Sequence, residues 1–219
     1  MTASKTPIYF VRGLAASPKI FEYLQLPEDQ FELYFLEWII PSSIDETIQD
    51  YSKRMAALVQ HPNPVLLGVS FGGIVVQEMS KHLDVKKIIL ISSIKSKYEL
   101  PNRLKAIQKT KIYKLFPVNS ISNLEEFVKY TFGEIAEKRV KLYREYLSIR
   151  DEKYLTWAIY NVLHWQQSTP LRNTLHIHGD VDHVFPIKHI KNCISITNGT
   201  HAMIIYKAKL VRQIIVDSF

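Results

Sequence analysis

Residues 65–79 read VLLGVSFGGIVVQEM, which joins a short apolar run to a helical repeat. The run Val65 to Leu67 has the length and composition of a strand that is buried on both faces. After Gly73 the apolar residues return at helical spacing, at Ile74, Val75, Met79 and Leu83. The stretch therefore predicts a buried strand that turns sharply into a helix.

The turn itself, Gly68-Val69-Ser70-Phe71-Gly72, has the pattern Gly-x-Ser-x-Gly. A sharp turn between strand and helix leaves no room for a Cβ atom at the two flanking positions, which accounts for the glycines. Ser70 would then stand at the apex with its hydroxyl exposed and with helix N–H groups pointing toward it. An ordinary glycine-rich turn would give the same five residues. The strand before it and the helix after it favour a nucleophilic serine.

The composition is that of an ordinary globular protein, with 219 residues, 47% apolar and 22% charged residues. This length suits one domain, and we find no repeat, no low-complexity tract and no apolar run near the roughly 18 residues of a membrane span. The first residues lack the apolar core of a signal peptide. Cys193 is the single cysteine, which excludes an internal disulfide and fits core packing rather than a reactive thiol. We expect a cytoplasmic protein without a membrane span.

Further strands and helices alternate along the chain. Strands are predicted at 8–11, 31–36, 87–92, 175–178 and 193–196, and helices at 18–24, 43–59 and 202–219. Ser17 and Ser43 are the expected N-caps, Ser43 with Glu46 in a capping-box pattern. Such alternation indicates an α/β fold with a parallel sheet, because parallel neighbours need crossover connections. The helical stretch after the strand at 87–92 interrupts the alternation, and we interpret it as a lid over the carboxyl edge of the sheet.

Two polar turns follow the last two predicted strands. Residues 178–186 read HGDVDHVFP and residues 198–203 read NGTHAM. A serine nucleophile needs a histidine base, which a buried carboxylate orients. After Gly-x-Ser-x-Gly these partners follow in the order acid, then histidine. The chain offers candidates in that order.

These three motifs resemble those of the α/β-hydrolase superfamily, and the resemblance covers nearly the whole chain. A turn of the form His-Gly-x-x-Asp-x-x-x-Pro carries the acid in that family, which implies Asp182, and a Gly-x-His turn carries the base, which implies His201. Asp180 competes with Asp182 but lies nearer the strand end. The resemblance is closest to small bacterial serine hydrolases of unassigned substrate, which share the Gly-Leu-Ala turn and the Trp38 to Pro41 segment. It implies a minimal fold, an open six-stranded parallel sheet in one domain over residues 1–219 with a helical lid at about 95–150.

The resemblance also implies an oxyanion hole made of two backbone N–H groups. Phe71, directly after the nucleophile, would supply one, and Leu14 in the turn after the first strand would supply the other. Arg12 stands where the family commonly has histidine, and it would either pair with a carboxylate or contact the substrate. Trp38 and His183 are further candidates for the pocket.

The remaining histidines show no metal-ligand spacing with carboxylates or cysteine. We therefore expect no metal and no cofactor. His178 ends a strand and is expected to hold the Asp182 loop by hydrogen bonding. The aromatic residues of the helical stretch, Trp157 among them, are expected to pack between the lid and the core.

The combined pattern predicts a serine hydrolase that cleaves a carboxylic ester or thioester, with Ser70 as nucleophile. A C–C lyase or an acyltransferase would use the same triad, and a binding protein with this fold would not need it. The expected partner is a small acyl ester or thioester and no nucleic acid. The segment 95–150 carries 13 basic and 6 acidic residues, so it holds the whole net charge of +7. This excess would serve either solubility or the attraction of an anionic substrate.

Overall fold

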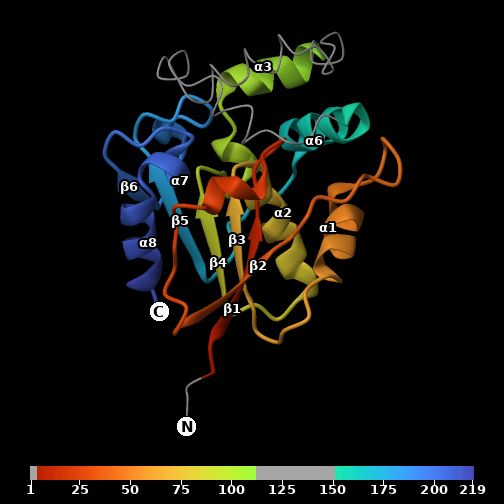
Figure 1. Cartoon of the computed structure of the whole chain (residues 1–219). Helices are drawn as coiled ribbons and strands as arrows, with labels where there is room; N and C mark the ends of the chain where they lie inside the picture. Colours follow the sequence, from red (N-terminus) through yellow and green to blue (C-terminus); the bar gives the residue numbers. More distant parts are fainter. Residues whose placement is uncertain (1–3, 112–150) are drawn as a thin grey trace.

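The computed structural model describes residues 4–111 and 151–219, and its centre is a twisted parallel sheet (Figure 1). The strands run in the order β2-β1-β3-β4-β5-β6, and each neighbouring pair is parallel. Their bounds are β1 Thr6–Val11, β2 Phe31–Phe35, β3 Val65–Val69, β4 Lys87–Ile91, β5 Thr174–Gly179 and β6 Ile194–Ile196. The predicted open sheet of six parallel strands is confirmed.

Helices cover both faces of this sheet (Figure 1). The α-helices are α1 Ile48–Ala56, α2 Phe71–Met79, α3 Asn102–Thr110, α6 Glu152–His164, α7 Met203–Tyr206 and α8 Ala208–Val216. Short 3-10 helices are η1 Pro18–Phe21, η2 Ser80–His82, η3 Lys97–Glu99 and η6 Ile187–His189. No α-helix in the described ranges is both long and apolar enough to span a bilayer.

The central strand β1 shows how the sheet separates two apolar cores. Successive side chains of a strand point to opposite faces. Tyr9 and Val11 accordingly join the core under α1, α2 and α6. Ile8 and Phe10 join the core under η1, α7 and α8. Both faces of β1 are therefore buried from solvent, as expected for an inner strand of a parallel sheet.

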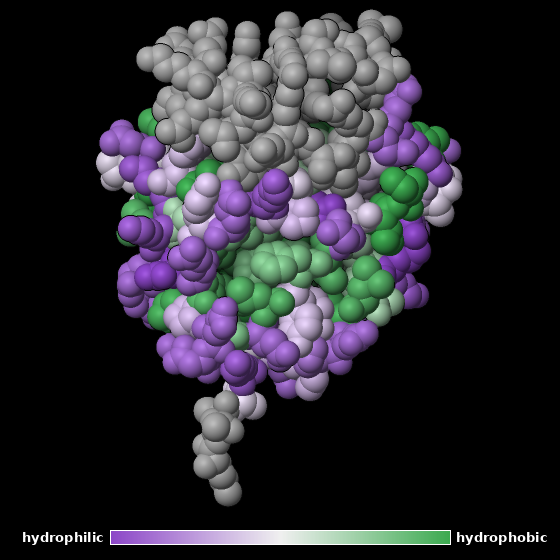
Figure 2. Space-filling model, in the orientation of Figure 1, coloured by the Kyte–Doolittle hydropathy of each residue, from purple (hydrophilic) through white to green (hydrophobic). Residues whose placement is uncertain are grey.

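One part of the sheet is covered less completely. The helix η1 has only four residues, and Phe35 at the end of the edge strand β2 is 44% exposed. The Phe35 ring stacks on Phe10 at 4.9 Å and approaches Phe21 at 5.9 Å. Figure 2 shows apolar side chains gathered on this face.

Several helices differ from the sequence-based prediction. The helix predicted at 43–59 begins only at Ile48, and its N-cap is Thr47 and not Ser43. Ser17 does cap the first helix, but that helix is a short 3-10 turn. The closing helix predicted at 202–219 is two helices, because Lys207 has non-helical backbone angles. Of the lid expected at about 95–150, only η3 and α3 are described; residues 112–150 lie outside the described part of the chain.

Candidate active site

The turn at Ser70 connects β3 directly to α2. Ser70 has φ 54° and ψ −119°, a conformation that non-glycine residues adopt only when the surrounding structure imposes it. Backbone contacts impose it here. Ser70 N–H donates to the carbonyl of Ile91 at 3.0 Å, and the carbonyl of Ser70 accepts from Ser93 Oγ at 2.7 Å. The nucleophile candidate is thus held by the end of β4 and the residues that follow it, in addition to the Gly73 N–H of its own turn, which donates to the Ser70 carbonyl at 2.9 Å.

The two glycines of the turn are required by space, as the sequence predicted. A Cβ atom on Gly68 would collide with the backbone of Gly72 and Gly73. A Cβ atom on Gly72 would collide with the carbonyl groups of Val11 and Arg12. The start of α2 therefore lies against the end of β1, so the turn at Ser70 is next to the turn that follows β1.

His201 connects Ser70 to Asp182. Its Nε2 lies 2.9 Å from Ser70 Oγ, and its Nδ1 lies 2.8 Å from Asp182 Oδ2. Because an ionised carboxylate only accepts, His201 Nδ1–H is the donor to Asp182, and in the neutral ring Nε2 accepts from the Ser70 hydroxyl. Asp182 follows β5 and His201 follows β6, so three turns at the carboxyl edge of the sheet supply the three side chains.

Asp182 is held ionised and in place by its own loop. The backbone N–H groups of Val184 and Phe185 donate to Asp182 Oδ1 at 2.7 and 2.9 Å. Burial by itself would raise the pKa of Asp182. The charge and hydrogen bond of His201 outweigh burial, so the pKa of Asp182 lies below its ordinary value. The carboxylate can therefore stabilise a positive charge on His201.

Asp180 does not take part in this arrangement. Its Oδ1 is buried without a hydrogen-bond partner among the described residues. The hydrogen bond to His201 comes from Asp182. Of the two carboxylates in the motif, the structure brings Asp182 to the histidine.

Two buried histidines lie behind Asp182 on β5. His178 Nε2–H donates to the carbonyl of Phe185 at 2.7 Å, which confirms that His178 holds the Asp182 loop. His178 Nδ1 lies 3.3 Å from His176 Nε2. Burial lowers the pKa of both rings, that of His176 to about 2, so both are neutral. In the sequence, the only signal for this pair is the alternation of His176 and His178 along the strand.

The two expected oxyanion donors lie in segments that touch each other. Phe71 is the first residue of α2, so its N–H has no carbonyl one turn earlier in the helix. A Cβ atom on Gly13 would lie 3.4 Å from Ser70 Cβ, which places the turn before Leu14 beside the serine. Leu14 and Phe71 remain the predicted pair of donors.

The other candidate residues differ in position. Arg12 is buried and pairs with Glu37 at 2.5 Å, the structural alternative considered from the sequence. Trp38 Nε1–H donates to the carbonyl of Gly13 at 3.4 Å, so this ring lies beside the proposed oxyanion turn. His183 is exposed to solvent.

An aromatic wall surrounds Trp38 and was only partly predicted. The Trp38 ring lies 5.5 Å from the rings of both Phe71 and Tyr154, and Tyr51 packs on Trp157 at 4.3 Å. Trp157 was expected as a packing residue, and this is confirmed. Tyr154 and Trp157 are three residues apart and so lie on the same face of α6. This spacing is the sequence feature that could have predicted the aromatic contact with Trp38 and Tyr51.

No group of three or more His, Cys, Asp and Glu side chains within residues 4–111 and 151–219 has the geometry of a metal site. The chemistry that this arrangement can perform is transfer of the Ser70 proton to His201, with attack by the serine oxygen.

Comparison with known proteins places this geometry in a known fold. No protein-family model matches the sequence, and no similar curated protein was found. Solved structures do match. A hydrolase from Pseudomonas aeruginosa PA01 has a TM-score of 0.76 and 17% identity over 99% of this chain and 90% of its own. A thermophilic esterase from Thermogutta terrifontis has a TM-score of 0.70 and 18% identity, over 99% and 90%. A bromoperoxidase from Bacillus anthracis has a TM-score of 0.70 and 17% identity, over 98% and 92%. At these identities the likeness shows a shared fold.

Proposed function

Given the α/β-hydrolase fold of this chain, we propose that it is a serine hydrolase that cleaves a carboxylic ester or thioester. One observation carries the proposal: His201 lies within hydrogen-bond distance of both Ser70 Oγ and Asp182 Oδ2. A protein that only binds ligands has no physical need for this alignment. The esterase and hydrolase among the similar structures support the reaction class.

In the proposed mechanism Ser70 Oγ attacks the carbonyl carbon while its proton moves to His201 Nε2. Asp182 stabilises the imidazolium that forms, and the N–H groups of Leu14 and Phe71 hold the developing oxyanion. Collapse breaks the bond to the alcohol or thiol, which takes the proton from His201. Water then attacks the acyl-enzyme with His201 again as base, which releases the acid and restores Ser70.

The substrate side of the site is proposed at the level of chemical class. Trp38 and the rings around it offer an apolar wall beside the turn that holds Leu14, which suits an acyl chain or an apolar leaving group. We propose that the chain works as one domain, residues 1–219, with 95–150 as a lid over this wall. The absence of cysteine pairs supports placement in a reducing compartment such as the cytoplasm.

Covalent labelling tests the proposal directly. The full chain is treated with a fluorophosphonate probe, and the labelled peptide is identified by mass spectrometry. We expect the label on Ser70 and none on the Ser70→Ala variant. Ser80→Ala is the matched control, because Ser80 caps the other end of α2 and donates to the carbonyl of Gln77. Full labelling of Ser70→Ala, or no labelling of the wild type, would overturn the assignment.

Turnover assays then separate hydrolysis from related reactions. A panel of p-nitrophenyl esters and acyl-CoA thioesters of graded length is tested with and without an added alcohol acceptor. We expect release of free acid, and for Ser70→Ala a rate lower by roughly 10⁶-fold. Labelling of Ser70 without acid release from any member of the panel would indicate transfer or lyase chemistry instead.

A further inference from the structure

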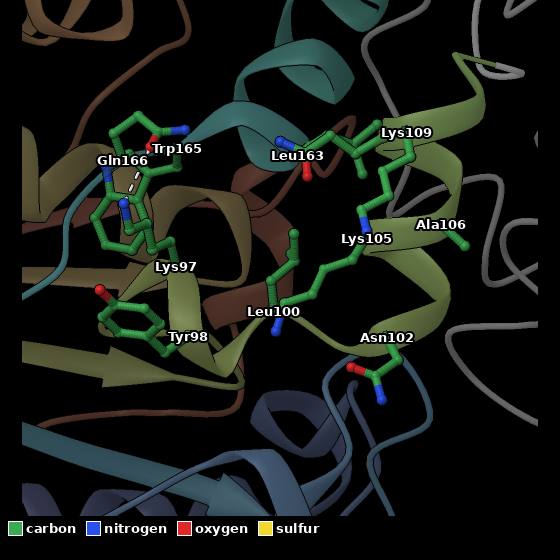
Figure 3. A pocket seen from close by; sticks show the side chains of 11 residues that line it. Lys97, Tyr98, Leu100, Asn102, Lys105, Ala106, Lys109, Leu163, Trp165 and Gln166 are labelled. Atoms are coloured by element: carbon green, nitrogen blue, oxygen red, sulfur yellow. Dashed lines mark hydrogen bonds between the residues drawn. The ribbon is translucent and has the colours of Figure 1, made fainter.

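A separate cavity lies between η3, α3 and the C-terminal end of α6 (Figure 3). Its volume is about 530 Å³. Lysines, two aromatic rings, aliphatic side chains and neutral polar groups line it: Lys97, Tyr98, Leu100, Asn102, Lys105, Ala106, Gln108, Lys109, Leu163, Trp165 and Gln166. None of Ser70, Asp182 and His201 is among them. The cavity is therefore distinct from the proposed catalytic site, and its size is within the range of small-molecule pockets.

The charged residues that line this cavity are all positive. Three lining residues are lysines, and none is acidic. Within the described part of the chain these lysines form no ion pair. Lys97 Nζ donates to the neutral amide oxygen of Gln166 at 3.3 Å. An anion in the cavity would thus meet ammonium groups that are paired with no carboxylate of residues 4–111 and 151–219.

Two buried acidic side chains in the described residues, Glu99 and Glu78, have other partners. The carboxylate of Glu99, the last residue of η3, accepts from the N–H groups of Lys95 at 2.6 Å and Lys191 at 3.1 Å. Glu78 Oε1 accepts from Trp165 Nε1 and from Lys81 Nζ, both at 2.7 Å. Neither carboxylate is bound to a lysine of the cavity.

The cavity also has an apolar side. Three of its apolar lining residues are packed into the protein and cannot move freely. They are Leu100, Leu163 and Trp165, with side chains 4%, 4% and 3% exposed. The Nε1–H of Trp165 donates to Glu78, which holds this buried ring in the wall of the cavity. Tyr98 is 67% exposed and adds an aromatic ring. Figure 3 shows Lys97, Tyr98 and Trp165 on one side of the cavity and Lys105 and Lys109 on the other.

We propose that this cavity binds an organic phosphate that also carries a planar ring. Lysine ammonium groups are point-charge ligands for phosphate. The exposed ring of Tyr98 suits stacking on a flat, partly apolar group, and the buried apolar side chains of the lining add apolar contact. Asn102, Gln108 and Gln166 supply neutral donors and acceptors for ring edges or hydroxyls. This combination fits a molecule that joins the two parts better than it fits either part alone.

Calorimetric titration of the full chain tests the proposal with three probes in magnesium-free buffer. Adenosine triphosphate carries both parts, adenosine only the ring, and tripolyphosphate only the charge. We expect adenosine triphosphate to bind and each partial probe to bind at least about tenfold more weakly. Equal affinity for tripolyphosphate and adenosine triphosphate would show that the planar ring does not contribute to binding, which would contradict the proposal of a ligand with both parts. No binding of adenosine triphosphate would overturn it altogether.

A pair of double variants shows where the binding occurs. Lys105→Met with Lys109→Met removes two charges one turn apart on α3 and keeps the apolar stems. Lys53→Met with Lys209→Met makes the same charge change on exposed positions of α1 and α8. We expect the first variant to weaken binding by about tenfold or more, and the second by less than about threefold. Equal losses in both variants would show binding by net charge alone and contradict the proposal.

The measurement is independent of the catalytic proposal. Ser70→Ala should bind adenosine triphosphate with wild-type affinity, because Ser70 does not line the cavity. The melting temperature of each variant is recorded, and the lysines that are replaced are at most partly buried. If Ser70→Ala lost binding while keeping its melting temperature, the probe would be occupying the Ser70 site, and the cavity would have no ligand of this class.

Discussion

The carboxylate of Asp182 uses its two oxygens for different purposes. Oδ1 accepts two backbone N–H groups of its own loop, and Oδ2 faces His201. The loop thus fixes which oxygen is left for the histidine. A side chain that replaces Asp182 must satisfy the same two N–H groups, and this determines what it presents to His201.

The change Asp182→Asn should lower kcat by about 10⁴ while the protein stays folded. The amide oxygen would be kept by the loop N–H groups, so the amide NH₂ would face His201 Nδ1. That forces the proton onto Nε2, and the ring can no longer accept from Ser70. The measurement is kcat against an activated ester, with KM recorded separately.

Asp180→Asn is the control for this change, because His201 forms its hydrogen bonds with Asp182 and Ser70 and not with Asp180. We expect its kcat within about threefold of the wild type. A large loss for Asp180→Asn with a mild effect of Asp182→Asn would reverse the assignment of the acid.

The buried His176 should make stability depend on pH. Its pKa is lowered to about 2 in the folded protein, chiefly by burial, against an ordinary value of about 6.5 in the unfolded chain. Below about pH 6.5 the unfolded chain therefore takes up a proton that the folded protein does not. The free energy of unfolding should fall with decreasing pH, by about 1.4 kcal/mol per pH unit for this group.

The test compares wild type and His176→Asn by denaturant unfolding between pH 4.5 and 7.5. The free energy of unfolding of the variant should depend less steeply on pH, by the contribution of one proton. The other groups, His178, His189 and the carboxylates, titrate in both proteins and cancel in the comparison. Parallel curves for the two proteins would show that His176 does not contribute.

At the scale of elements, the strands and the three polar turns were predictable, and the helix ends were not. An inner parallel strand is a short apolar run wherever it occurs, so β1, β3 and β4 were visible without knowledge of their neighbours. Ser70, Asp182 and His201 each follow a strand, and parallel strands bring their carboxyl ends to one edge. Their placement at one edge therefore followed from a parallel sheet, whereas the strand order β3-β4-β5-β6 that brings them into contact was known only from the structure.

The start of α1 depended on a partner that local sequence does not reveal. The pair Ser43 and Glu46 has a capping-box pattern, but Glu46 instead accepts from Arg54 Nε and from Ser42 N–H, at 2.8 and 2.6 Å. The carboxylate of Glu46 is therefore not available for a capping box with Ser43. The N-cap of α1 is Thr47, whose Oγ1 accepts from Asp50 N–H at 3.1 Å. The break at Lys207 has no glycine or proline to mark it in the sequence.

Thr47→Ala should therefore destabilise the protein by about 1 kcal/mol through loss of the N-cap. Ser43→Ala should change the free energy of unfolding by less than about 0.5 kcal/mol, since Ser43 lies outside the helix. Urea unfolding monitored by circular dichroism measures both. A larger cost for Ser43→Ala than for Thr47→Ala would restore the earlier helix start.

At the scale of the whole molecule, charge is distributed unevenly. Residues 95–150 have a net charge of +7, from 13 basic and 6 acidic residues, and the rest of the chain sums to zero. If this segment attracts an anionic substrate, the attraction must weaken with salt, because exposed charges are screened over about 8 Å at physiological ionic strength.

We expect kcat/KM for an acyl-CoA thioester to fall at least about threefold between low and high salt. A neutral ester with the same acyl chain should barely change, and it serves as the control for salt effects on the protein itself. An equal response of the two substrates would leave the basic segment with a role in solubility only.

The order of the strands also has a consequence for how activity arises during folding. Strands β1 to β4 are joined by short connections, whereas β5 must find β4 across residues 92–173. Closing a long loop is slow relative to closing short ones. Ser70 belongs to the part with short connections, and Asp182 and His201 both belong to the part that must dock. In refolding we therefore expect circular dichroism to recover before ester hydrolysis, since until β5 docks the serine has neither its base nor its acid.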